Sequence, residues 1–169
     1  MGTQITKYPV NSVFYINASG GTIIGPNVNT VEISESILIP ANTLVNSSII
    51  QLLFRVSKSD SATTTFQCYI YKNTSNSLVG ATLLGTVDSG TSSKTFKTNA
   101  QKIIQYKSSN IIVIDSTALT LNDFTSGTGS APTSVAFNTA VNNYIIIAVG
   151  AASLTSTSQV TFCKLDINA

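Results

Sequence analysis

The chain of 169 residues contains no histidine, so it lacks the side chain that most often serves as a general base near neutral pH. Catalytic arrangements that pair histidine with serine or cysteine are therefore excluded. Glycoside hydrolysis would instead require two carboxylates placed across a cleft. The seven acidic residues are Glu32, Glu35, Asp60, Asp88, Asp115, Asp123 and Asp166. Glu32 and Glu35 lie three apart in a strand-like pattern, so we expect them to point to opposite faces, and we expect no enzyme.

Metal and phosphate sites are not indicated either. Calcium needs several oxygen ligands in a compact loop, and Asn122-Asp123 lacks the Asp-x-Asp spacing that predicts one. Gly20-Gly21 and the glycines at 127 and 129 lack the helix and lysine of a phosphate-binding loop. The two cysteines, Cys68 and Cys163, are either buried free thiols or a bridge between facing strands. We therefore expect no metal and no cofactor.

Charged residues make up only 9% of the chain, against about 25% in a typical soluble domain. The net charge is +2 and the nine cationic residues are scattered, so nucleic acid and an anionic membrane are not expected partners. The densest basic stretch, from Lys94 to Lys107, is interpreted as a solvated strand pair with its loop. No apolar run approaches the roughly 20 residues of a membrane-spanning helix, so membrane insertion is not expected.

Short runs of β-branched and aromatic residues, separated by Gly, Asn, Ser, Asp and Pro, predict a chain of strands. The expected strands are Val10–Asn17, Gly21–Ile24, Val31–Ile39, Ser48–Ser57, Thr64–Lys72, Leu83–Val87, Thr95–Asn99, Lys102–Lys107, Ile111–Asp115, Ser134–Asn138, Tyr144–Ala151 and Gln159–Ile167. Only Ala118–Phe124 could form a single helical turn, and Gly127–Pro132 is expected to be loop.

This pattern predicts an all-β fold, an antiparallel two-sheet β-sandwich of the jelly-roll type. We expect a single domain overall. Residues 1–30 are expected to form N-terminal strands or an attachment segment, and residues 31–169 to form the sandwich.

The strand expected at Thr64–Lys72 has one apolar face and one face that is polar but aromatic. Gln67, Tyr69 and Tyr71 lie on the second face. Exposed aromatic rings beside amide and hydroxyl groups are suited to a shallow sugar site. The favoured interpretation is that these tyrosines pack in a subunit interface or under a loop. Gln67, Tyr69 and Tyr71 are therefore candidates for glycan contact or subunit contact.

Several expected strands are apolar on both faces, which an isolated two-sheet sandwich would cover on one side only. The clearest are Tyr144–Val149, Ile49–Phe54 and Ile111–Ile114. Most strands also carry at most one charge, although exposed edge strands are usually guarded by lysine or proline. We therefore expect a homo-oligomer, with a cyclic trimer as its form.

Three segments carry a resemblance to a known group of proteins. Ile37–Leu44 reads ILIPANTL and precedes the apolar strand Ile49–Val56. Tyr69–Thr86 reads YIYKNTSNSLVGATLLGT, and Asn143–Ile147 reads NYIII before a final alternating strand. This order resembles jelly-roll domains in virion proteins of tailed bacteriophages, such as tail-fibre tips, head fibres and capsid-decorating proteins. The resemblance transfers no catalytic residue.

The resemblance implies a structural protein exposed on a phage particle, with other virion proteins as partners and a host-surface glycan as a further partner. If Met1 is the natural start, only the residues up to Thr30 precede the similar part, which favours a decoration or head-fibre protein over a full tail fibre. The alternative is a non-catalytic carbohydrate-binding module. The expected location is the virion.

Overall fold

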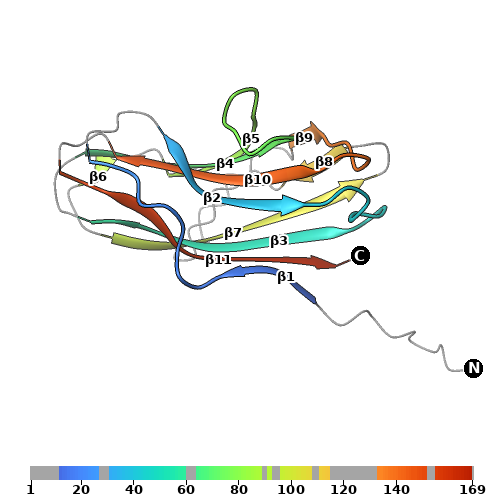
Figure 1. Cartoon of the computed structure of the whole chain (residues 1–169), viewed down its shortest axis with the longest axis horizontal. Coiled ribbons are helices and arrows are strands. Elements are labelled where there is room, and N and C mark those ends of the chain that lie inside the picture. The colour runs from blue at the N-terminus through green and yellow to red at the C-terminus, as the bar shows by residue number, and fades with distance from the viewer. Residues whose placement is uncertain are drawn as a thin grey trace, which may run out of the picture.

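The structure is a computed structural model, and it describes residues 12–26, 31–59, 64–88, 91–92, 96–107, 111–114, 133–151 and 155–168. All of its regular elements are strands, arranged in two antiparallel layers (Figure 1). The first sheet has the order β1 (Ser12–Asn17), β11 (Ser158–Asn168), β3 (Ile49–Lys58), β7 (Phe96–Lys107), β8 (Ile111–Ile114), β9 (Thr133–Ala136). The second has the order β2 (Glu32–Ile39), β10 (Asn143–Ala151), β4 (Thr64–Asn73), β5 (Thr82–Asp88), and the short β6 (Thr91–Ser92) pairs with β4.

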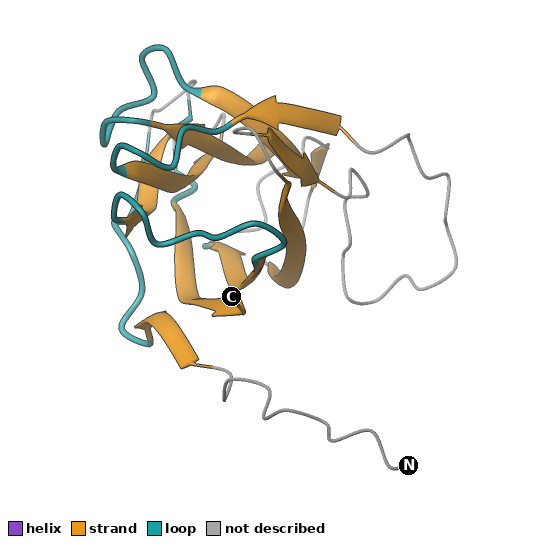
Figure 2. Cartoon of the chain, turned by 90° about the vertical axis from the view of Figure 1, so that its right-hand side faces the viewer, coloured by secondary structure: helices purple, strands orange, loops and turns teal. Residues whose placement is uncertain are grey.

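The strand order is that of a jelly roll, so the expected fold class is confirmed. The chain passes from β1 in the first sheet to β2 in the second, back to β3, and across again to β4. The last two strands, β10 and β11, each insert between strands formed much earlier in the chain. Four strands of each sheet form this roll, and β8 and β9 extend the first sheet beyond β7. Seen end-on, the two sheets face each other across the interior (Figure 2).

Most of the expected strands are present, and three differ. Thr95–Asn99 and Lys102–Lys107 are parts of one continuous strand, β7. Gly21–Ile24 is not a strand but makes an isolated bridge between Ile24 and Ser158. The expected turn at Ala118–Phe124 and loop at Gly127–Pro132 lie outside the described residues.

The first β-strand pairs with β11 over its whole length, so the described residues before position 30 belong to the sandwich. No helix among the described residues is long and apolar enough to cross a membrane.

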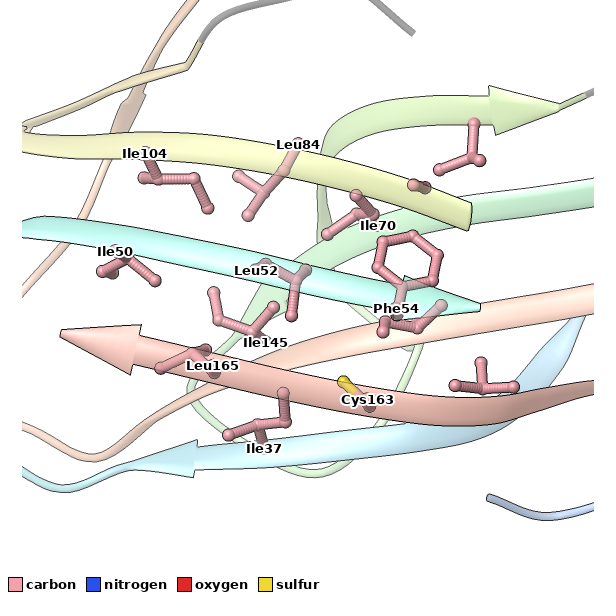
Figure 3. Close-up of a cluster of buried hydrophobic side chains, with 14 of the residues drawn as sticks. Ile37, Ile50, Leu52, Phe54, Ile70, Leu84, Ile104, Ile145, Cys163 and Leu165 are labelled. Carbon is pink, nitrogen blue, oxygen red and sulfur yellow. The ribbon is translucent and has the colours of Figure 1, made fainter. Parts of the chain in front are cut away.

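The core lies between the sheets and is built from alternate residues of each strand (Figure 3). In β3, Ile50, Leu52, Phe54 and Val56 are fully buried, while the residues between them are exposed or half-buried. The side chains drawn from the second sheet point into the same layer: Ile37, Ile70, Leu84 and Ile145. Both cysteines lie buried in this core, one on each sheet and not joined by a disulfide, and burial raises the pKa of Cys163.

The structure confirms that β10 is apolar on both faces. It does not confirm the expected consequence, which was that a partner subunit must cover the outward face of this strand. Ile145, Ile147 and Val149 belong to the core, whereas Ile146 and Ala148 point to the outside of the second sheet. All five are nevertheless fully buried in the single chain. The double-sided pattern of β10 therefore does not by itself require a partner subunit.

The other two strands of that group differ from β10. β3 is buried on one face only, and Ile49 and Leu53 on its other face are exposed or half-buried. The side chains of Ile111–Ile114 lie outside the described residues.

The interpretation of Lys94 to Lys107 as a solvated stretch is wrong for Lys102. This lysine pairs with Leu52 in the ladder, so it shares the inward face of β7 and is buried. Its side chain crosses the interior to β5, where its Nζ would lie 3.1 Å from a Cβ placed on Gly85. Ile104 and Tyr106, which share this face of β7 with Lys102, are buried as well.

One side of the sandwich is closed by a segment that joins the sheets. Gly21 N donates to Val160 O (2.7 Å) on β11, and Thr22 N donates to Ser34 O (2.7 Å) on β2. Gly21 sits so close to β2 that a Cβ there would lie 2.0 Å from the Ser34 carbonyl oxygen. Hydrogen bonds along this segment occupy donors and acceptors at the margins of both sheets.

Gly21→Ala should lower the free energy of unfolding by about 1–3 kcal/mol, because overpacking against backbone forces the two sheets apart. Thr22→Ala is the matched control: its side chain is exposed and its backbone bonds remain, so a change within about 0.5 kcal/mol is expected. Urea unfolding followed by fluorescence or circular dichroism measures both. Equal stability of the Gly21→Ala variant and the parent would contradict the close approach.

Candidate contact surface on the second sheet

The outward side chains of the second sheet form rows across its four main strands. In one row, Ile146 of β10 lies between Ser36 of β2 and Tyr71 of β4. In the next row, Ala148 lies between Ile33 and Tyr69. Residues paired in an antiparallel ladder share a face, so a tyrosine of β4 lies beside the apolar residue of β10 in each row. We call the surface built from these rows the outer face; its residues are Ile33, Ser36, Leu38, Gln67, Tyr69, Tyr71, Asn73, Leu83, Thr86, Tyr144, Ile146 and Ala148.

The structure places Gln67, Tyr69 and Tyr71 together on the outer face, as the alternation of their strand predicts. All three are half-buried. The rings of Tyr69 and Tyr71 are 6.1 Å apart between centroids and tilted by 54°, so they do not form one flat platform. Burial, and then the neighbouring Tyr69, raise the pKa of Tyr71, which keeps its hydroxyl a neutral donor and acceptor. Whether they contact a glycan or a subunit stays a prediction.

Apolar side chains are exposed at both margins of the outer face. Leu38 of β2 is 41% exposed and Leu83 of β5 is 46% exposed. Tyr144 is half-buried in the same row as Leu38. None of the residues that make up the outer face is charged. The surface is therefore neutral from one edge strand to the other.

The outward side of the first sheet differs in charge. Arg55 of β3 lies there, with its Nε donating to Asn99 Oδ1 (2.8 Å). Lys164 and Asp166 of β11 form an ion pair at 2.7 Å on the same side. Apolar residues are present as well, since Ile103 is 46% exposed. Both sides of the sandwich therefore expose apolar groups, but only the outward side of the first sheet carries charged residues among them.

The β4–β5 loop, residues 74–81, rises from the second sheet beside the outer face (Figure 1). Asn73 organises it: its side-chain Nδ2 donates to the carbonyl oxygens of Ser77 (2.7 Å) and Val79 (3.0 Å). Its Oδ1 accepts from Thr74 N (2.7 Å). These bonds make a turn in which an asparagine side chain satisfies backbone groups of the loop. The exposure of Val79 in this loop could not be read from the sequence.

Glu35 is the most buried acidic residue of the described part, and it joins the sheets instead of facing a cleft. Tyr15 Oη on β1 donates to its Oε1 (2.9 Å), and Asn17 Nδ2 donates to its Oε2 (2.6 Å). The expectation that Glu32 and Glu35 point to opposite faces is wrong. Ser34 is an extra residue in the β2 ladder, so Glu35 pairs with Ile147 and Glu32 with Val149, both inward positions.

This arrangement does not make a catalytic pair, because Glu32 is exposed and the donors to Glu35 are neutral side chains. No group of three or more potential metal ligands occurs within the described ranges. The chemistry of the Glu35 site is structural: it fixes the edge strand of one sheet to the edge strand of the other.

The opposite side of the sandwich is joined by a lysine. Lys72 of β4 donates from Nζ to Ala136 O of β9 (2.9 Å), and the same Nζ lies 5.6 Å from the centre of the Phe137 ring. Burial lowers the pKa of Lys72. This contact ties the end of the second sheet to the outermost strand of the first.

Comparisons with known proteins identify no family. No family model matches the chain, and no curated protein is similar to it. Among solved structures, it is similar to the legume lectin-like domain from Entamoeba histolytica, with 11% identity, coverage of 90% of this chain and 89% of that chain, and a TM-score of 0.33. An identity and TM-score this low carry no argument about what this chain binds.

The Glu35 site predicts a loss of stability in strong alkali. Burial and the hydrogen bond to Glu35 raise the pKa of Tyr15 from 10.0 to about 12. The folded chain therefore holds this proton more tightly than the unfolded chain, so the stabilisation is complete below pH 10 and is lost as the pH rises through about 12. Unfolding in urea between pH 8 and 12, together with phenolate absorbance, measures this loss.

Tyr15→Phe is the comparison for that titration. The variant should be less stable at neutral pH by roughly 1 kcal/mol or more, because Glu35 loses a donor. Its stability should then fall less between pH 10 and 12 than that of the parent, with Tyr71 and Cys163, whose pKa values burial also raises, contributing to the remaining alkaline loss. The same alkaline loss in both proteins would exclude Tyr15 as its source.

Proposed function

We propose that this chain is a non-catalytic structural protein of a bacteriophage particle, exposed as a capsid decoration, head fibre or tail-fibre tip. Its role would be assembly with other virion proteins and attachment to the host surface. The location on a particle is supported by a resemblance to jelly-roll virion proteins, in the segments Ile37–Leu44, Tyr69–Thr86 and Asn143–Ile147. The role in assembly is supported by the neutral outer face. The jelly-roll strand order is compatible with this location and with this role.

The physical argument for assembly compares the free energy of burying a charged surface with that of burying a neutral one. Burying a charged group without a partner is expensive, whereas neutral aromatic and aliphatic groups gain free energy when removed from water. The outer face offers Tyr69, Tyr71 and Tyr144 with Leu38 and Leu83 beside them. Interfaces are enriched in aromatic residues and depleted of charge at their centre. The outer face therefore has the composition of a contact surface.

Localisation on particles tests this proposal. Antibodies raised against the purified chain, or peptides identified by mass spectrometry, should detect it in particles purified through a density gradient. Particles that carry a known capsid protein but no trace of this chain would overturn the virion proposal. Labelling confined to head or tail would identify which of the three positions it occupies.

A carbohydrate-binding module is a second candidate, supported by the clustering of Gln67, Tyr69 and Tyr71 on one face. If this is the function, the purified chain should bind glycans on an array, and Tyr71→Ala should weaken binding by at least about tenfold. Phe162→Ala is the matched control, since Phe162 is a half-buried aromatic residue on the outward side of the first sheet. Equal loss in both variants would exclude the outer face as the glycan site.

A further inference from the structure

We propose that a second copy of this chain covers the outer face, and that the β4–β5 loop forms one wall of that contact. The inference rests on the assembly part of the proposed function and names its partner. It depends on three features of the described residues: a loop held in one conformation, a neutral surface continuous with it, and the placement of charge on the two sides of the sandwich.

The loop is held by its own hydrogen bonds, so little conformational entropy remains to be lost on contact. Ala81 N donates to Leu78 O (3.1 Å), Ser77 N to Ser75 O (2.8 Å) and Val79 N to Ser77 Oγ (3.0 Å). Gly80 has a φ of +74°, a left-handed conformation that most residues adopt only with strain. These bonds add to those of Asn73, and together they fix the loop upright on the sheet (Figure 1).

This ordered loop presents an apolar side chain to solvent. Val79 is 87% exposed, the highest value among the exposed large hydrophobic residues of the described chain. Leu83, just beyond the loop, continues the apolar surface down to Tyr71, its partner in the ladder. The sequence from Asn73 to Val87 contains no charged residue. Loop and sheet thus form one neutral surface with an upright wall.

The distribution of charge favours contact between the outer faces of two copies over contact between an outer face and the first sheet of another copy. Two outer faces can meet without bringing any charged side chain of their rows into contact. If a copy instead applied its first sheet, Arg55, Lys164 and Asp166 would have to leave water against an uncharged surface. Contact between like faces is the arrangement that avoids this cost. A trimer is compatible when three copies direct this face toward a common axis.

The apolar area buried in the contact would come from the margins of the outer face and from the β4–β5 loop. Ile146 and Ala148 are already buried, so they contribute a flat floor and no further apolar area. Leu38, Leu83 and Val79 are the apolar groups left to be removed from water, together with the half-buried tyrosines. Substitution at these three exposed positions should therefore act on association with little effect on the fold.

Analytical ultracentrifugation of the whole chain tests the inference. The parent should sediment as two or three chains and dissociate on dilution. Leu83→Asp and Val79→Asp should each weaken association by at least about tenfold, because a carboxylate would have to leave water against an uncharged surface. Ile103→Asp is the matched control: Ile103 is 46% exposed, as is Leu83, but lies on the outward side of the first sheet. It should leave association unchanged, and circular dichroism should show all three variants folded.

The inference is overturned by a parent that stays monomeric up to millimolar concentration, or by an Ile103→Asp variant that dissociates as readily as Leu83→Asp. Its failure can be separated from failure of the proposed function. A monomeric chain that is still found on purified particles retains the virion role and loses the self-contact. A chain absent from particles that nevertheless associates through Leu83 and Val79 retains the contact and loses the virion role.

Discussion

The burial of β10 on both of its faces is the constraint on which the rest of the structure depends. β10 runs between β2 and β4, so it fixes which of their residues point inward and which outward. Its inward isoleucines and valine meet Ile50, Leu52 and Phe54 of β3 in the common core. Its outward Ile146 and Ala148 make the floor of the outer face. A polar residue at either set of positions would disturb the core or the surface proposed for contact.

The outward residues of β10 lie beside tyrosines of the same chain, not beside a second protein. Tyr69 and Tyr71 lie beside Ala148 and Ile146 in the ladder, and a phenol ring is large enough to lean over a smaller neighbour while its hydroxyl reaches water. This explains how β10 can carry apolar residues on its outward side while those residues stay out of water. It also means that the tyrosines have a structural role whether or not they contact a ligand.

Alternation of residue types was enough to predict most strands, the jelly-roll class and the common face of Gln67, Tyr69 and Tyr71. These features depend on the period of two that every strand imposes on its side chains. What the sequence could not show is where that period breaks. The extra residue Ser34 turns Glu35 inward, and no local signal distinguishes it from its neighbours. Lys102 was misread for a different reason: it shares the inward face of Ile104 and Tyr106, but a lysine was expected to be solvated.

The candidate surface could be predicted only in part for the same physical reason. A single strand reveals which residues share its own face, but the neutral surface arises from four strands that are distant in sequence. Its neutrality emerges only when the registers of β2, β10, β4 and β5 are known together.

The seams between the sheets explain why a neutral face need not lead to uncontrolled strand pairing. On one side, Gly21 and Thr22 bond to β11 and β2, and Glu35 binds Tyr15 and Asn17. On the other, Lys72 reaches Ala136 on β9. These contacts place polar groups and a crossing segment where edge strands would otherwise offer free hydrogen-bonding groups. The proposed association is thereby directed away from the edges and toward the outer face, where side chains and not backbone groups would decide which partner fits.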